Sequence, residues 1–192
     1  STGLTESQMS SYMARVNYSY KDRYLLTVSG RYDGSSVLAD GNKWSFFPSA
    51  ALGWRIDQES FMEGIDWINQ LKLRFGVGST GNSSVSPYGK LGVISAYWMP
   101  FGNAGGNQQI FVTNEPYYSS GSNLLPNKNL GWERTTQFNY GIDFSVLDGR
   151  IGGTIDIYHS RTTDLLMSRN ISPLSGYPAI LDNIGEPKNF GV

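Results

Sequence analysis

The chain has 192 residues, enough for one domain with its own core, and its net charge of −1 gives no electrostatic basis for a nucleic-acid partner. It contains no cysteine, which excludes disulfides and cysteine-based zinc sites. No window approaches the roughly 18–20 apolar residues of a spanning helix, and 23 glycines, 12 tyrosines and 5 tryptophans favour β-structure with aromatic anchors.

Two strands joined by a tight turn are predicted at residues 11–20 and 24–33. Side chains of a β-strand point alternately to opposite faces, so a strand with one apolar face shows apolar residues at every second position. Both segments have this alternation, and residues 21–23 form the turn between them. The apolar positions are Tyr12, Ala14, Val16, Tyr18 and Tyr20 in the first strand, then Tyr24, Leu26, Val28, Gly30 and Tyr32 in the second.

A third strand over residues 44–56 and a fourth over residues 71–77 show the same alternation. The segment between them, Asp57–Gln70, predicts a short amphipathic helix. Ser60 and Glu63 have the spacing of a capping box, and apolar residues at 61, 65 and 68 share one side.

The fifth and sixth strands are predicted at residues 137–146 and 151–158, with a second tight turn between them. Every charged residue inside the six strand cores falls on the less apolar face. An arginine or lysine at the midplane of a lipid-facing surface costs about 2–4 kcal/mol, so this segregation is typical of a barrel whose charges face the lumen. A soluble sandwich segregates charges in the same way, with water in place of the lumen. The predicted lumen-facing charges are Arg15, Arg31, Arg55, Lys72, Arg74, Asp143 and Asp156.

The connections differ systematically between the two ends of the strands. Short connections alternate with a modest polar loop at residues 34–43, a loop of about fifty residues at 79–129, and another long segment from residue 161 onward. Loops above about 15 residues are uncommon in compact domains unless they are functional. We therefore predict an all-β, antiparallel up-and-down transmembrane β-barrel segment of about six strands with long extracellular loops. The alternative is a soluble β-sandwich that binds carbohydrate or protein.

Aromatic residues stand near both ends of the predicted strands. Tyrosine and tryptophan favour membrane interfaces because the ring is apolar while the hydroxyl or N–H remains hydrated. In a soluble sheet the same residues would pack at the edge of the core. The predicted membrane-interface aromatics are Tyr12, Tyr20, Tyr24, Tyr32 and Trp54.

Several ordered motifs cover nearly the whole chain: residues 12–18 with 24–36, FPSAALGWRI at 47–56, GSTGN at 78–82, NLGWE at 129–133, DIY at 156–158 with TDLL at 163–166, and residues 183–186 with 189–192. Together they resemble SusC/RagA-type TonB-linked (TonB-dependent) outer-membrane transporters of Bacteroidota. The last of these motifs looks like the hairpin approach to the next strand of that family.

The resemblance implies that residues 1–192 are part of a 22-stranded barrel, without the plug, the TonB box or the C-terminal strand. It also implies a place in the bacterial outer membrane, surrounded by lipid. The whole transporter would import oligomeric nutrients, either oligosaccharides or peptides. Its expected partners are a SusD-like lipoprotein at the outer mouth and TonB–ExbB–ExbD, which would act through segments absent here.

The longest predicted loop is rich in aromatic residues among glycine, asparagine and glutamine. Rigid rings beside amide side chains suit contacts with a sugar, a peptide or a partner protein. The alternative is that the rings pack together as the core of the loop itself. The candidate ligand-binding residues are Tyr97, Trp98, Phe101, Tyr117 and Tyr118.

Nothing in the sequence indicates an enzyme, a cofactor or a metal site. Residues 76–81 fit G-x-G-x-x-G, but Asn82–Pro87 follows in place of the helix that dinucleotide binding requires. His159 is the only histidine and is expected to be an interfacial polar residue. Asp57, Glu59 and Asp148 are expected to satisfy donors of turns or caps. We therefore predict no catalytic residue.

Overall fold

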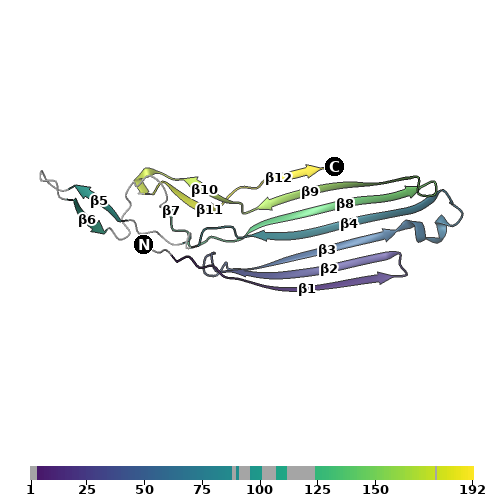
Figure 1. Cartoon of the computed structure of the whole chain (residues 1–192), viewed down its shortest axis with the longest axis horizontal. Helices are drawn as coiled ribbons and strands as arrows, with labels where there is room; N and C mark the ends of the chain where they lie inside the picture. Colours follow the sequence, from purple (N-terminus) through teal and green to yellow (C-terminus); the bar gives the residue numbers. More distant parts are fainter. Residues whose placement is uncertain (1–3, 88–89, 91–95, 101–106, 112–123, 176) are drawn as a thin grey trace.

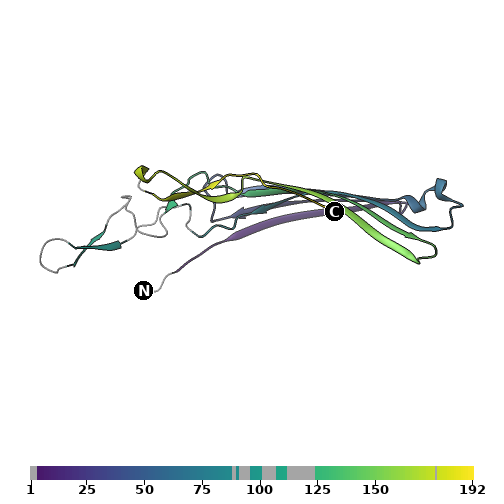
Figure 2. The ribbon, with the colours of Figure 1, turned by 90° about the horizontal axis from the view of Figure 1, so that it is seen from above.

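The structure, a computed structural model, describes residues 4–87, 90, 96–100, 107–111, 124–175 and 177–192. Its main feature is an antiparallel sheet of seven strands that forms one gently curved layer (Figures 1 and 2). The strands, in spatial order, are β1 (Met9–Tyr20), β2 (Tyr24–Ser35), β3 (Trp44–Arg55), β4 (Ile68–Asn82), β8 (Glu133–Val146), β9 (Ile151–Thr163) and β12 (Lys188–Gly191). This confirms the all-β, up-and-down antiparallel prediction, and the sheet is open, with β1 and β12 at its edges.

Tight turns connect β1 to β2 and β8 to β9 at the end of the sheet that we call the turn end. Lys21 and Asp22 have φ angles of 52° and 53°, and Leu147 and Asp148 have 56° and 54°. Two consecutive residues with positive φ give a hairpin turn whose twist matches that of the flanking strands. The opposite end, where the longer connections lie, is the loop end.

The predicted helix between β3 and β4 is wrong. The segment instead contains two single 3₁₀ turns, η1 (Ile56–Gln58) and η2 (Ser60–Met62), without a side-chain cap. The side chains of Asp57 and Glu59 bond to the sheet, and Gly64, with φ of 100°, bends the chain. Among the described residues, no helix is long and apolar enough to cross a bilayer.

The strands are longer than the apolar alternation indicates. β4 begins at Ile68 and continues to Asn82, and β8 begins at Glu133, because pairing continues past the last apolar positions. Beyond the loop end, β5 (Ala96–Pro100) pairs with β6 (Asn107–Phe111), and β10 (Leu166–Asn170), β11 (Ala179–Asn183) and β7 (Leu124–Leu125) form a small sheet; η3 (Pro173–Ser175) lies between β10 and β11.

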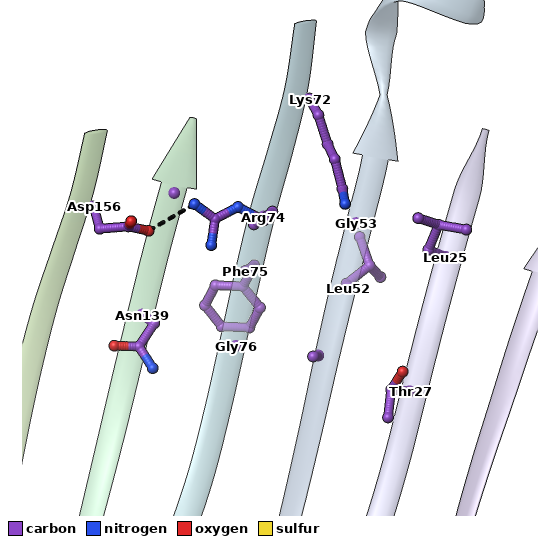
Figure 3. Close-up of a pocket in the computed structure, with 12 residues that line it drawn as sticks. Leu25, Thr27, Leu52, Gly53, Lys72, Arg74, Phe75, Gly76, Asn139 and Asp156 are labelled. Carbon is purple, nitrogen blue, oxygen red and sulfur yellow. Dashed lines mark hydrogen bonds and ion pairs between the residues drawn. The ribbon is translucent and has the colours of Figure 1, made fainter. Parts of the chain in front are cut away.

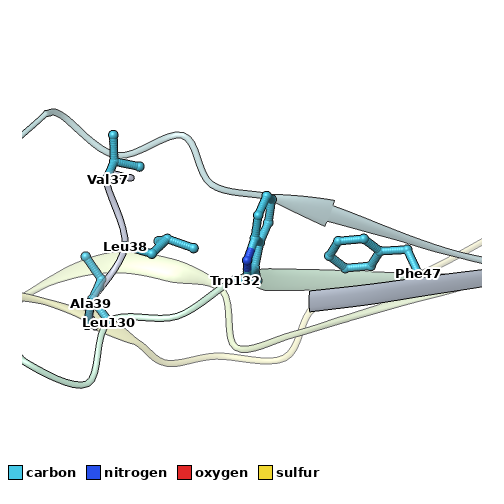
Figure 4. Packing of buried hydrophobic residues seen from close by; sticks show 6 residues of the cluster. All are labelled: Val37, Leu38, Ala39, Phe47, Leu130 and Trp132. Atoms are coloured by element: carbon cyan, nitrogen blue, oxygen red, sulfur yellow. The ribbon is translucent and has the colours of Figure 1, made fainter. Parts of the chain in front are cut away.

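The buried hydrophobic residues gather at the loop end of the sheet. This loop-end cluster contains Val37, Leu38, Ala39, Phe47, Leu130 and Trp132 (Figure 4). The description of residues 34–43 as a polar loop is therefore wrong, because three consecutive residues of that loop are buried. Hydrogen bonds to backbone carbonyls fix it there: the Ala39 N–H donates to the Leu130 carbonyl at 3.0 Å, and the Trp132 indole N–H donates to the Lys43 carbonyl at 2.9 Å.

Candidate functional site: the two faces of the sheet

All seven predicted lumen-facing charges lie on one face of the sheet, which we call the polar face. Directly opposed residues of neighbouring strands share a face. The register pairs Arg55 with Lys72 and Lys72 with Asp143. The registers of β1, β2 and β9, with alternation along the strands, place the other four charges on the same side. The sheet therefore separates charges from large apolar residues as the sequence predicts.

A charge network crosses three strands of the polar face. The guanidinium of Arg74 on β4 donates to both carboxylate oxygens of Asp143 on β8, at 2.8 and 2.9 Å, and to Asp156 on β9 at 2.9 Å. The Thr154 hydroxyl also donates to Asp143, at 3.0 Å. A bidentate pair of this kind combines geometric specificity with strong hydrogen bonds. The network thus fixes the positions of β4, β8 and β9 relative to one another.

Other polar-face charges also have partners. Arg31 pairs with the fully buried Asp33 at 2.6 Å, and Arg55 pairs with Asp57 at 3.0 Å. Among the described residues, Arg15 and Lys72 form no ion pair. The polar face is therefore largely neutralised, with two cations left to interact with solvent or a ligand.

A hollow of about 370 Å³ lies on the polar face between β2 and β9 (Figure 3). Glycines form part of its floor, so charged side chains lie flat across neighbouring strands. Arg74 lies over Gly141, where an added Cβ would be 2.7 Å from the guanidinium carbon, and Lys72 lies over Gly53, where a Cβ would be 3.3 Å from its Cε. The hollow offers a cation, an amide and a hydroxyl from Lys72, Asn139 and Thr27 to a polar ligand.

The opposite face, the apolar face, carries the predicted interface aromatics in two groups. At the loop end, the Trp44 ring stacks against Tyr32 and Tyr12, with ring centroids 5.0 and 6.1 Å apart. At the turn end, Tyr24 lies between Tyr20 and Trp54, each 6.4 Å away. Trp44 is not among the predicted interface aromatics. Its stacking against Tyr12 and Tyr32 on neighbouring strands shows that it belongs to the loop-end group.

Glu59 connects the turn-end aromatics to the 3₁₀ segment. Its carboxylate accepts hydrogen bonds from the Tyr24 hydroxyl at 2.7 Å and the Trp54 indole at 3.0 Å, and it pairs with Arg23 at 3.2 Å. The hydrogen bond from Tyr24, followed by that from Trp54, holds the pKa of Glu59 below its usual range. The sequence predicts that Glu59 satisfies donors of a turn or cap, whereas the structure gives it side-chain partners. The partners of Glu59 lie up to 36 residues away in the sequence, and no local sequence pattern predicts these contacts.

Asp57 does satisfy a backbone donor, as expected. One carboxylate oxygen accepts the Leu71 N–H at 3.3 Å. Burial opposes ionisation of Asp57, but hydrogen bonds from Gln58, Arg55 and Leu71 outweigh it and lower the pKa.

Large apolar side chains stay exposed on the apolar face between the two aromatic groups. Val16 is 67% exposed, Leu52 49% and Ile155 50%. Extended apolar surfaces of this kind mark contacts with a membrane or another protein.

The apolar band runs obliquely across the strands. Val16, Val28, Ala50, Val77, Phe138 and His159 are successive cross-strand partners and define one line across the sheet. On β1 the band extends four residues to each side of this line, from Tyr12 to Tyr20. On β9 it lies wholly on the turn side, from Ile157, two residues away, to Ile151, eight residues away.

This displacement gives the tilt of the strands from the normal to the band. From β1 to β9 its edges shift by four to six residues, about 13–20 Å, over five inter-strand spacings, about 24 Å. The ratio corresponds to a tilt of about 30–40°, close to the roughly 35–45° of transmembrane barrels.

The candidate loop aromatics are not brought into one site by the described residues. Tyr97 and Trp98 lie in β5, which pairs with β6. Phe101, Tyr117 and Tyr118 lie outside the described residues, so ligand binding by this set stays a prediction. Within the described part of the chain, no group of three His, Asp or Glu side chains has the arrangement of a metal site.

A sequence model of the family "TonB dependent receptor-like, beta-barrel" matches residues 2–192. The chain belongs to this family. It is 39% identical to TonB-dependent receptor SusC of Bacteroides thetaiotaomicron over 98% of its length, and 36% identical to TonB-dependent receptor P26 of Formosa agariphila over 96%. It spans 18% of the length of each.

Solved structures share the fold. The RagAB peptide importer in its closed-closed state matches 95% of this chain with a TM-score of 0.77 at 24% identity, and its open-open state matches 96% with a TM-score of 0.77 at 23% identity. The SusC/RagA resemblance is thus confirmed. The family consists of outer-membrane transport receptors and not of enzymes, as the sequence predicts.

Proposed function

We propose that this chain forms a section of the barrel wall of an outer-membrane, TonB-dependent importer. The apolar face contacts lipid, and the polar face contacts the lumen. The oblique apolar band carries this proposal, because strands inclined by about 30–40° to the normal of the band match the tilt of barrel strands in a flat membrane. The two aromatic groups lie at the edges of the band, where interface residues belong.

The importer that contains this wall takes up oligomeric nutrients, glycans or peptides, with a SusD-like lipoprotein at its outer mouth and energy from TonB–ExbB–ExbD. Its similarity to SusC, and to a structure described as a peptide importer, supports this class of cargo. The polar hollow around Lys72 and the loop aromatics supply cargo contacts. The hydrogen-bonded loop end supplies a preformed surface for the lipoprotein.

The alternative, a soluble β-sandwich, requires a second sheet about 10 Å from the apolar face. In the described part of the chain, the residues that would be covered remain exposed, as at Val16 and Ile155. The small sheet of β10, β11 and β7 lies at the loop end (Figure 1).

Cysteine labelling of the intact receptor in lipid nanodiscs tests the proposal. The chain has no cysteine of its own, so single substitutions report without background from this segment. We expect Val16→Cys to resist a water-soluble maleimide, whereas Asn17→Cys, which points to the polar face, reacts. His159→Cys lies on the same cross-strand line as Val16 and should react at least fivefold faster, because the tilt brings it to the interface. Equal protection of residues 16 and 159 would contradict a tilted wall.

A further inference from the structure

Three residues on β8, β9 and β12 form a polar row on the apolar face, just beyond the loop-side edge of the apolar band. Thr136 is the cross-strand partner of Arg161, and Arg161 is the partner of Lys188. The neighbouring row toward the turn end consists of Phe138, His159 and Phe190, whose two phenyl rings are exposed on this face. On β8 and β12 the polar row therefore lies one apolar-face position, about 7 Å along the strand, past the last large apolar residues, and on β9 His159 lies between Arg161 and the last large apolar residue, Ile157.

The row carries excess positive charge. Arg161 and Lys188 stand directly opposite each other, and like charges in this arrangement repel. Glu186 pairs with both, directly with Arg161 and at 3.6 Å with Lys188, but one carboxylate compensates only one of the two cations. The side chains of Arg161 and Lys188 are 52% and 60% exposed, so both are accessible from the lipid side.

We propose that Thr136, Arg161 and Lys188 bind the phosphate of a lipid headgroup at the outer membrane interface. This inference rests on the proposed function, because the proposed function places the apolar band in lipid. A phosphate is the anion that an interface presents at this height. Arginine and lysine pair with it strongly, and the threonine hydroxyl donates a further hydrogen bond. His159, between two phenyl rings below the row, marks the change from acyl chains to headgroups.

Lipid binding to the intact receptor, measured by native mass spectrometry, tests the site. We expect the wild type to retain bisphosphorylated lipid A about tenfold better than phosphatidylcholine. Arg161→Gln combined with Lys188→Gln should remove most of this preference, and Arg161→Lys with Lys188 intact should keep it. Arg150→Gln, which removes a cation at the turn end, is the matched control and should leave the preference unchanged.

Two outcomes would overturn the proposal. One is an unchanged preference in the double variant. The other is displacement of lipid A by 10 mM inorganic phosphate, which would make the row a site for free anions. Failure of the proposed function can be distinguished from failure of the phosphate site, because Val16→Cys would then react with the water-soluble maleimide. Protection at Val16 without any headgroup preference would reject only the phosphate site.

Discussion

The sheet and the loop-end cluster use apolar residues in opposite ways. In the sheet, Val16 and Leu52 remain about half or more exposed, whereas in the cluster Leu38 and Leu130 have no exposed surface. The cluster is built like the core of a water-soluble protein, from segments about 90 residues apart in the chain. The sheet has no such interior, and under the proposed function lipid covers its apolar face. On that proposal, one chain is adapted to two solvents.

The largest test of this contrast removes a leucine from each region. Leu130→Ala should lower the free energy of unfolding by about 3–5 kcal/mol, because a fully buried site loses contacts and leaves a cavity. Leu52→Ala should cost about 1–2 kcal/mol in lipid, since acyl chains fill the vacated space and only the transfer term is lost. Denaturant unfolding of the intact receptor in lipid measures the change in stability of each variant. Equal losses of stability would mean that the two leucines are covered in the same way.

The second test places a charge on each face. Val16→Arg should destabilise the receptor in lipid by about 2–4 kcal/mol, because the guanidinium enters the middle of the apolar band. Asn17→Arg, its neighbour on the polar face, should change the stability by less than about 0.5 kcal/mol. Folding yield into lipid vesicles and unfolding by urea report the difference. A tolerated arginine at position 16 would mean that water, rather than lipid, covers that face.

The smallest expected effect concerns Glu59, which connects the turn-end aromatic group to the 3₁₀ segment. Because the folded-state pKa of Glu59 is lowered, its contribution to stability is present above the unfolded pKa of about 4.3 and is lost as pH falls through the folded pKa. Glu59→Gln should remove this acid dependence and slightly loosen the Trp54 indole. Unfolding midpoints between pH 3 and pH 7 compare the two proteins, and identical pH profiles would show that Glu59 is not coupled to folding.

The strands and their faces could be predicted because period-two alternation is local. Positions such as Val16 and Ile155 reveal their face from immediate neighbours alone. The ends of the strands could not be predicted in this way, because the pairing of β4 with β8 continues through polar residues as far as Asn82 and Glu133. The only sequence signal for the short strand β12 is the family motif at residues 189–192, because four residues carry too little alternation.

The wrong sequence predictions have a common physical cause, because the structure of each segment depends on partners that are distant in the sequence. The helix predicted from Ser60 and Glu63 does not form, because nearby Asp57 and Glu59 bond to strands instead of capping a helix. Residues 37–39 look like part of a polar loop until Leu130 and Trp132 cover them. The stacking of Trp44 with Tyr12 and Tyr32 likewise depends on the register of three strands.

The Arg74–Asp143 pair has a consequence for how the sheet closes. It joins β4 to β8, and the connection between these strands runs from residue 83 to residue 132, whereas three residues connect β1 to β2. Loop closure over that length costs about 2.5 kcal/mol more entropy than closure of the short turn. The bidentate Arg74–Asp143 pair therefore joins the two neighbouring strands of the sheet whose connection is longest and costs the most entropy to close.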